Sequence, residues 1–362
     1  MLSNFPFPLL LIHAVFFLCS VFFSFLINGL LLKFVRTLGI RNEDEATIRW
    51  SVKAKPALGG LSFYIIFLFS ITSYSILFEK NALFENHQFI GVLLASTIGF
   101  MLGLFDDAYN TKPWLKLFAQ ISCAFTLIVS GTYIHMFSNV YLDYIFTIFW
   151  VVGIMNSINL LDNMDAVSTF VSSSILITII TTIILQNDFS NPLLFITTGV
   201  LASLIGFLYY NWNPSKMFMG DTGSQFLGVF LASVGIVFFW NVKETSGNEI
   251  PNKQLMITLL AFIVPIIDTF TVVIKRLSMK KSPFIGGKDH TTHHLSYLGF
   301  SDRTVSLIIL AISLFSSFLI ILLLNFIEWK QIYFVPLIIY FIAVFAILFY
   351  ISNINKKDAN HP

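Results

Sequence analysis

Charged side chains are scarce in this chain: Asp, Glu, Lys and Arg together make up 11% of its 362 residues. A soluble domain carries roughly 25%, so the composition excludes a water-soluble protein with a large core. Cysteine is also sparse, and both Cys19 and Cys123 lie in apolar segments, which argues against a disulfide. The alternation of polar and apolar residues that membrane β-strands require is missing. Apolar residues are abundant instead, at 56% of the chain, with 41 Phe.

Long apolar runs divide the sequence into about eleven segments, each of roughly the 20 residues that a helix needs to cross a ~30 Å hydrocarbon layer. Helices satisfy their own backbone hydrogen bonds inside a bilayer. The sequence therefore predicts an all-α integral membrane protein, a polytopic bundle that forms a single domain over residues 1–362. Merging one pair of segments would change the count. The expected spans are 8–32, 57–78, 88–105, 115–136, 140–157, 167–186, 192–210, 223–240, 254–275, 304–326 and 331–351.

Basic residues are concentrated on one side of these spans. In an eleven-span topology, 17 of the 21 Lys and Arg residues fall in the loops after odd-numbered spans, at the adjoining span ends (Lys116 and Lys275), or in the C-terminal tail. The positive-inside rule places this side in the cytoplasm. The basic residues do not form an extended domain that could follow a phosphate backbone, which argues against nucleic acid as a partner.

Short polar breaks on that same side carry most of the residues that are capable of chemistry. They read KPALGG, LFDDAYNTKP, NSINLLDNMDA, FMGDTGS and SPFIGGKDHTTHHL. Because a chain so poor in charge places its carboxylates at one water interface, we expect a single active site built from cytoplasmic loops and helix ends.

The first two breaks offer a cation and a pair of carboxylates. Lys55 would either bind phosphate or extend to the membrane interface. Asp106 and Asp107 end a span, and adjacent helical residues point about 100° apart, so the pair would flank a site from two directions. Like charges this close resist joint ionisation unless a cation lies between them. A plain acidic helix end is the alternative.

The third break places polar residues at intervals of three. Asn156, Asn159, Asp162 and Asp165 would lie on a slowly turning helical stripe. A buried polar stripe without partners is costly in a membrane, and carboxamides with carboxylates suit a divalent cation, a sugar or a nucleotide base. The alternative is a polar seam between two helices.

Glycines bracket the carboxylate of the fourth break. Gly220 and Gly223 flank Asp221 directly before a span, which resembles a helix N-terminus whose free N–H groups favour phosphate oxygens. A carboxylate beside them needs a cation to bridge it to a phosphate, so Asp221 is the strongest candidate for a metal ligand. A helix N-cap is the alternative.

The fifth break clusters three histidines, His290, His293 and His294, beside the basic residue Arg276. Structural zinc usually recruits cysteine or a more distant pair of ligands, so these histidines are better suited to hold phosphate oxygens or to organise an acid. Asp268, inside the ninth expected span, is either functional or a link between helices.

Carboxylates, glycine-rich turns and cations at a bilayer surface suit phosphoryl transfer, in which a protein mainly positions groups and neutralises charge. Magnesium, with manganese as the alternative, would bridge the oxygens of a nucleotide diphosphate. An acceptor phosphate monoester, with a second pKa of roughly 6, is largely dianionic at neutral pH. A general base is then optional, so the spacing leaves open whether Asp106 or Asp107 removes a proton.

In this order, and alternating with spans, the five breaks resemble the polyprenyl-phosphate N-acetylhexosamine-1-phosphate transferases of glycosyltransferase family 4. The resemblance runs from about residue 50 to about residue 300, and the WecA-like branch fits best. The related phospho-MurNAc-pentapeptide transferases carry a triple-His motif followed by Phe-Glu, whereas this chain reads Asp-His-Thr-Thr-His-His-Leu. The resemblance implies transfer of GlcNAc-1-phosphate from a UDP-amino sugar to undecaprenyl phosphate, with release of UMP. It further implies the bacterial cytoplasmic membrane and the first membrane step of surface polysaccharide synthesis.

The resemblance also implies roles for individual residues. The implied catalytic residues are Asp106, Asp107, Asp162 and His290, and the implied magnesium ligands are Asp221 and Asp162. The implied substrate-binding residues are Lys55, Asn159, Asp165, Asn211, Phe218, Arg276, His293 and His294. Asn163 and Ala166 stand where relatives usually have glycine, so base contacts and sugar selectivity are less defined than the reaction.

Two alternatives remain from the sequence. The first is the same chemistry with another UDP-N-acetylamino sugar. The second is a secondary transporter, although transporter sites tend to lie near the midplane of the membrane, often between internal repeats. A homodimer is left open.

Overall fold

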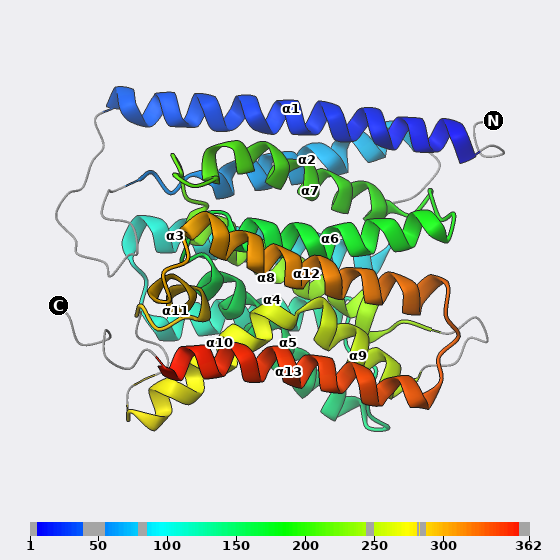
Figure 1. Cartoon of the computed structure of the whole chain (residues 1–362). Helices are drawn as coiled ribbons and strands as arrows, with labels where there is room; N and C mark the ends of the chain where they lie inside the picture. The colour runs from blue at the N-terminus through cyan, green and yellow to red at the C-terminus, as the bar shows by residue number, and fades with distance from the viewer. Residues whose placement is uncertain are drawn as a thin grey trace.

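The computed structural model describes residues 6–38, 55–78, 85–243, 250–280, 282 and 287–354. Long helices run side by side in one bundle, and the start of α1 and the end of α13 lie at opposite ends of it (Figure 1). Within the described ranges the only β-type contact is an isolated bridge between Ala57 and Phe218. The prediction of an all-α membrane protein is confirmed.

The helices are α1 (Pro6–Leu38), α2 (Gly59–Leu77), α3 (His87–Tyr109), α4 (Pro113–Val129), α5 (Val140–Leu161), α6 (Val167–Leu185), α7 (Pro192–Asn211), α8 (Gly220–Gly235) with its π-helical extension η2 (Ile236–Trp240), α9 (Pro251–Ala261), α10 (Ile263–Ser278), α11 (Thr291–Tyr297), α12 (Asp302–Asn325), the 3-10 turn η3 (Gln331–Tyr333) and α13 (Phe334–Ile354).

Every expected span has a helical counterpart, but two differ from the prediction. In the described part of the chain, nine helices are long and apolar enough to cross a membrane, or ten if the bent pair α9 and α10 counts as one. The eleventh, α4, has 17 residues and ends at Val129, because Ser130 and Gly131 follow, the latter at φ +82°. The span expected at 254–275 bends by 78° between α9 and α10.

Pro265 accounts for this bend. Proline lacks an N–H and its ring clashes with the carbonyl four residues earlier, which belongs to Ala261, the last residue of α9. Phe262 at the junction has φ −107° and ψ 27°, outside helical geometry. The break turns α10 toward α11, which places the basic end of α10 beside the histidine segment.

The helix α8 forms the centre of the bundle and packs against α2, α3 and α5. Glycines allow this close packing: a Cβ on Gly103 of α3 would lie 2.2 Å from the carbonyl oxygen of Asp221. By contrast, α1 and α13 expose many large apolar side chains, as expected for helices that face lipid. The start of α8 is therefore fixed against the end of α3.

The short helix α11 and the ends of α10 and α13 lie at the end of the bundle opposite the start of α1 (Figure 1). Chain order places the end of α3 and the starts of α4 and α8 at that same end. The polar breaks therefore meet at one end of a largely apolar bundle.

Candidate active site

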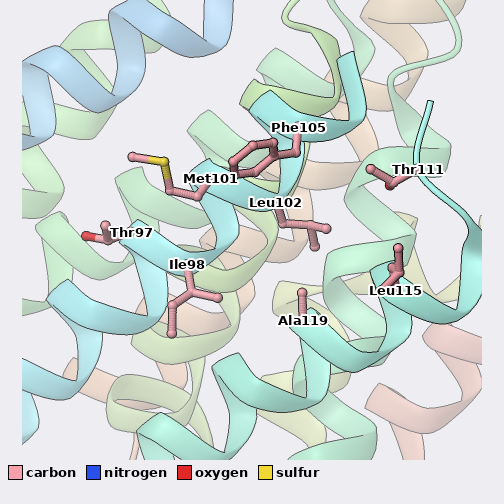
Figure 2. Close-up of a pocket in the computed structure, with 8 residues that line it drawn as sticks. All are labelled: Thr97, Ile98, Met101, Leu102, Phe105, Thr111, Leu115 and Ala119. Atoms are coloured by element: carbon pink, nitrogen blue, oxygen red, sulfur yellow. The ribbon is translucent and has the colours of Figure 1, made fainter. Parts of the chain in front are cut away.

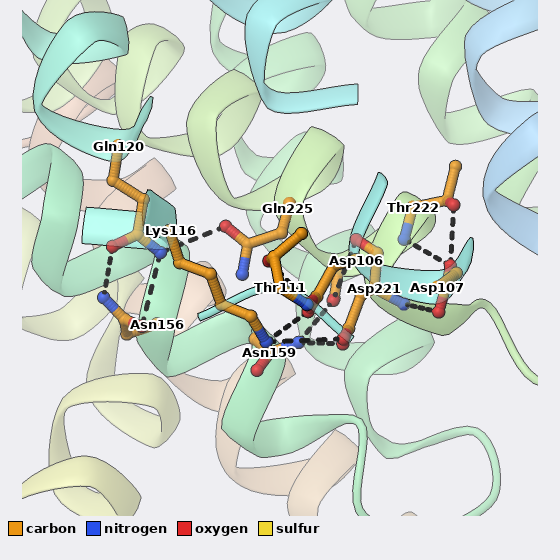
Figure 3. A network of polar contacts seen from close by, with 11 residues as sticks. Asp106, Asp107, Thr111, Lys116, Gln120, Asn156, Asn159, Asp221, Thr222 and Gln225 are labelled. Carbon is orange, nitrogen blue, oxygen red and sulfur yellow. Dashed lines mark hydrogen bonds and ion pairs between the residues drawn. The ribbon is translucent and has the colours of Figure 1, made fainter. Parts of the chain in front are cut away.

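Two carboxylates from helices far apart in the sequence share one ammonium group (Figure 3). Lys116, in the first turn of α4, forms an ion pair with Asp106 at the end of α3, and its Nζ lies 3.9 Å from Oδ2 of Asp221. The backbone N–H and the hydroxyl of Thr111 donate to Asp106 Oδ1 at 2.9 and 2.8 Å. The ammonium offsets the repulsion between the two carboxylates.

Asp107 has a different task from its neighbour Asp106. Its Oδ1 accepts from the N–H of Asp221 at 3.0 Å, and its Oδ2 accepts from the N–H and the hydroxyl of Thr222 at 2.8 and 2.6 Å. The two N–H groups belong to the first turn of α8, whose amides have no partner within the helix. Asp107 therefore caps α8 from another helix. The adjacent pair does point in two directions, as the spacing indicated.

This cap corrects two expectations about the start of α8. The N–H groups of Asp221 and Thr222 are not free for phosphate oxygens, because Asp107 accepts from both. Asp221 is not the N-cap either: the N-cap position is Met219, and Asp221 lies in the first helical turn. Gly220, at φ +73°, adopts a left-handed conformation that glycine tolerates.

The polar stripe of the third break reaches the same carboxylates. Asn159 Nδ2 donates to Asp221 Oδ1 at 2.6 Å and to Ser224 Oγ at 2.9 Å. Asp162 is half-buried at the C-cap of α5, and its role as a catalytic residue and metal ligand stays a prediction. Among the described residues, no group of three or more His, Cys, Asp or Glu could hold a metal ion by itself.

A second cluster surrounds Asp165. Its carboxylate accepts from the N–H and the hydroxyl of Ser215 at 2.9 and 2.7 Å and from Asn213 Nδ2 at 3.0 Å. Lys55 Nζ lies 3.5 Å from Asp165 Oδ1 and 4.9 Å from the ring centre of Phe218. The structure thus brings together Lys55, Asp165 and Phe218, three of the residues expected to bind substrate.

Asn211 is 1% exposed and its amide is used by the protein itself. Its Oδ1 accepts from the N–H of Ala166 and the hydroxyl of Thr169, and its Nδ2 donates to the carbonyl of Met217 at 3.1 Å. These bonds join the end of α7 to the start of α6, and a role in nucleotide binding stays a prediction. Ala166 has φ +65°, a conformation that is costly for residues other than glycine.

Asp268 links α10 to α11. This buried carboxylate accepts from His290 Nδ1 at 2.8 Å and from the N–H and hydroxyl of Thr291 at 2.8 and 2.7 Å. It therefore caps α11 and fixes the orientation of the His290 ring. Because Nδ1 donates to Asp268, Nε2 is the ring nitrogen left to face a ligand.

The basic end of α10 holds the rest of the histidine segment. Arg276 forms a two-point ion pair with Asp289, at 2.8 and 2.6 Å, and is 3% exposed. Burial favours a raised pKa for Asp289, but Arg276 more than offsets this and holds that pKa below its usual value. Substrate binding by Arg276 stays a prediction. The segment 283–286 lies outside the described residues.

The remaining two histidines of α11 are buried. Lys275 Nζ lies 2.8 Å from His294 Nε2 and donates to the carbonyl of Ser352 in α13 at 2.6 Å. Burial, followed by the charge of Lys275, lowers the pKa of His294 to about 4. Burial, followed by the charge of His290, lowers the pKa of His293 to about 3. Both imidazoles are therefore neutral at pH 7.

An apolar groove of about 500 Å³ runs between α3 and α4 (Figure 2). It is lined by Thr97, Ile98, Met101, Leu102, Phe105, Thr111, Leu115 and Ala119. Thr111 belongs both to the groove and to the Asp106 network. The groove therefore ends at the site.

Sequence reasoning missed Lys116 and the buried amides of Gln120 and Gln225. A signal for the first two was present, because Lys116 and Gln120 stand four residues apart on an otherwise apolar helix, which places both on one face. Gln225 likewise stands four residues after Asp221 on α8.

The fold and the site define a class of protein: a multi-pass, all-α membrane protein with carboxylates and an ammonium group at one end of its bundle. The profile described as Glycosyl transferase family 4 matches residues 89–239, which include Asp106, Asp107, Asn159, Asp162 and Asp221.

Relatives in three bacteria extend this match. A probable undecaprenyl-phosphate N-acetylglucosaminyl 1-phosphate transferase of Bacillus subtilis is 28% identical over 303 residues, covering 81% of this chain and 80% of that protein. A phospho-N-acetylmuramoyl-pentapeptide-transferase of Staphylococcus carnosus is 30% identical over 280 residues, covering 69% of this chain and 79% of that protein. A decaprenyl-phosphate N-acetylglucosaminephosphotransferase of Mycobacterium leprae is 27% identical over 284 residues, covering 71% of this chain and 70% of that protein. The chain belongs to glycosyl transferase family 4, as the resemblance indicated.

Proposed function

We propose that this protein transfers a sugar 1-phosphate, foremost GlcNAc-1-phosphate, from a UDP-amino sugar to undecaprenyl phosphate. The products are a polyprenyl-diphosphate-sugar and UMP. The observation that carries the proposal is the ammonium of Lys116 between the carboxylates of Asp106 and Asp221, at the end of an apolar groove. The names of the Bacillus and Mycobacterium relatives support the same reaction.

The site has the charges that such a reaction needs. Two anionic substrates must approach each other, and carboxylates alone would repel both of them. Lys116 supplies one positive charge at the junction, and the basic residues Lys55 and Arg276 lie in the neighbouring clusters. The groove between α3 and α4 would accommodate part of an apolar chain while its phosphate reaches Lys116.

Asp221 suits a magnesium ion. One of its oxygens accepts from Asn159, and the side chain is 34% exposed, with Oδ2 directed toward Lys116. Magnesium usually takes one or two protein carboxylates and fills its other positions with water and substrate phosphates. Fewer than three clustered protein ligands, as found among the described residues, are therefore compatible with a magnesium ion that also binds a nucleotide diphosphate. We propose Asp221 and Asp162 as ligands, and the bound ion would neutralise charge on the leaving phosphate.

In the proposed reaction, an oxygen of the acceptor phosphate forms a bond to the phosphorus that carries the sugar. The bond from that phosphorus to the oxygen shared with UMP breaks, and UMP leaves with this oxygen. The acceptor is already largely dianionic at neutral pH, since its second pKa is roughly 6. Asp107 then acts by holding the start of α8, because its oxygens accept three hydrogen bonds from that helix.

We further propose that the site faces the cytoplasm in the bacterial cytoplasmic membrane. The concentration of 17 of the 21 Lys and Arg residues on the site's side supports this orientation. Most of the basic loop, residues 39–54, lies outside the described residues. Family membership argues against the transporter alternative, whereas another UDP-N-acetylamino sugar remains the second candidate for the donor.

The test uses purified full-length protein with undecaprenyl phosphate and a panel of UDP-sugars, with magnesium or with a chelator. The assay measures UMP and the lipid-linked product. Magnesium-dependent release of UMP together with a lipid-linked GlcNAc is the expected result. A different sugar on the lipid would correct the donor, and silence across the panel from folded protein would refute the proposed reaction.

A further inference from the structure

Three carboxamides form a hydrogen-bonded network beside the carboxylate site, as Figure 3 shows. Gln120 comes from α4, Asn156 from α5 and Gln225 from α8. Each lies about one turn deeper along its helix than a residue of the site: Gln120 follows Lys116 by four, Asn156 precedes Asn159 by three, and Gln225 follows Asp221 by four. We call these three residues the amide triad.

The direction of the hydrogen bonds in the amide triad is fixed by a backbone carbonyl. Asn156 Nδ2 donates to the carbonyl of Val152 at 2.8 Å and to Gln120 Oε1 at 2.9 Å. A carbonyl oxygen can only accept, so the Asn156 amide cannot flip, and Gln120 must present its oxygen to Asn156. Gln120 Nε2 then donates to Asn156 Oδ1 at 3.3 Å and to Gln225 Oε1 at 3.1 Å.

This chain of bonds leaves one donor group unused. Both hydrogens of Asn156 Nδ2 and both of Gln120 Nε2 have partners, whereas Gln225 Nε2 has none among the residues that the structure describes. Gln225 is 3% exposed as a whole, but its Nε2 is not one of the fully buried polar atoms that lack a partner in the described chain, so this nitrogen can be reached by a bound molecule. Water or a ligand can therefore serve as the partner of this donor.

The position of Gln225 on α8 directs this donor toward the site. Side chains in a helix lean toward its N-terminus, and Asp221 lies one turn in that direction, about 6 Å along the axis. Figure 3 shows the amide nitrogen of Gln225 turned away from Gln120. The acceptor that suits both the Lys116 ammonium and the Gln225 amide is an anionic oxygen.

We propose that Gln225 is a ligand-binding residue that donates a hydrogen bond to a phosphate oxygen held at Lys116, and that Gln120 and Asn156 fix its orientation. The inference rests on the proposed function for the source of that oxygen, which is either the acceptor monoester or the donor diphosphate. A hydrogen bond to a charged group contributes about 1.5–3 kcal/mol, which corresponds to roughly 10- to 150-fold in affinity.

The experiment compares Gln225→Leu, Gln225→Glu and Gln120→Leu with the parent protein, and Gln254→Leu serves as the matched control. Gln254 is a fully buried glutamine in α9, outside the site, and it too makes a side-chain hydrogen bond. Elution as a single species and thermal unfolding verify the fold of each variant. The KM for UDP-GlcNAc, the KM for undecaprenyl phosphate and the Kd for inorganic pyrophosphate with magnesium are measured separately.

We expect Gln225→Leu to raise one KM by at least about 10-fold with a smaller change in kcat. The substrate whose KM rises identifies the source of the oxygen. Gln225→Glu should lose more affinity for the ligand, because its carboxylate has the same sign of charge as the phosphate. Gln120→Leu should lose less affinity, because it only frees the Gln225 amide to rotate. Gln254→Leu should match the parent protein.

Unchanged KM values and unchanged pyrophosphate affinity in folded Gln225→Leu would overturn the inference, as would an equal loss in Gln254→Leu. If Gln225→Leu does not fold, the isosteric Gln225→Glu decides by the same criterion. Absence of turnover in the parent protein would instead refute the proposed function, and the pyrophosphate comparison would still decide the role of Gln225.

Discussion

Lowering the pH from 7 to 5 should destabilise the fold through His293 and His294 of α11. Both are 2% exposed, and burial lowers their pKa values to about 3 and about 4. In the unfolded chain the pKa of histidine is near 6.5. At a pH between the folded and the unfolded pKa values, these histidines bind more protons in the unfolded chain than in the folded chain. The free energy of unfolding therefore falls as the pH falls. The stabilisation is present above about pH 6.5 and is lost toward pH 4 and 3.

The size of this loss follows from proton linkage. At pH 5 an unfolded histidine is almost fully protonated, whereas both folded imidazoles are still largely neutral, which gives a loss of about 2 kcal/mol for each residue relative to pH 7. Asp289, whose pKa the Arg276 ion pair lowers, contributes only nearer pH 4 and below. The expected loss between pH 7 and pH 5 is therefore about 4 kcal/mol, from the two histidines together.

Chemical or thermal unfolding of the purified protein at pH 7, 6 and 5 measures this dependence. His294→Gln removes one titrating group and should reduce the pH-dependent loss by about half. His87→Gln, at the exposed start of α3, serves as the control and should keep the slope of the parent protein. Equal stability at pH 7 and pH 5, or an unchanged slope in His294→Gln, would refute the reasoning.

Three further variants test single contacts. Asp221→Asn should abolish turnover without loss of the folded protein, and normal magnesium-dependent activity in this variant would contradict its assignment as a metal ligand. Asp107→Ala should lower the free energy of unfolding by about 1–2 kcal/mol, the usual contribution of a helix cap, and an unchanged unfolding midpoint would argue against that cap. Asp268→Asn should lower kcat more than it changes KM, because His290 loses its orienting acceptor. The matched variant Thr291→Val removes only a hydroxyl donor from the same carboxylate, and an equal loss of kcat there would assign Asp268 to capping alone.

The helical bundle could be predicted because hydropathy reports directly on contact with lipid. The bend within 254–275 could not be read from hydropathy, since both halves are apolar, although Pro265 marks the carbonyl that loses its partner. The short helix α4 was expected to run to residue 136 because Ile134 and Met136 continue its apolar character. In the structure that stretch turns back instead, and the N–H of Ile134 donates to Thr147 of α5.

Sequence spacing predicted which residues would gather but not how they would pair. Asp106, Asn159 and Asp221 meet as expected, because breaks on one side of a bundle share one water interface. Their pairing depends on helix packing over long sequence distances, which no local pattern records. Sequence reasoning assigned Lys116 no role of its own, although in the structure it joins α3, α4 and α8.

The cap on α8 changes how this site must recognise phosphate. A glycine-bracketed helix start would ordinarily offer its N–H groups to an anion, but Asp107 accepts from two of them and places a carboxylate there instead. A second negative group at that point would be repelled. In the proposed function, we therefore expect phosphate oxygens to be held mainly by side chains and by the proposed cation at Asp221. Lys116 lies beside Oδ2 of Asp221, and Gln225 stands one turn further along α8. In our proposal these two side chains supply the donors that the N–H groups of a helix start would otherwise provide.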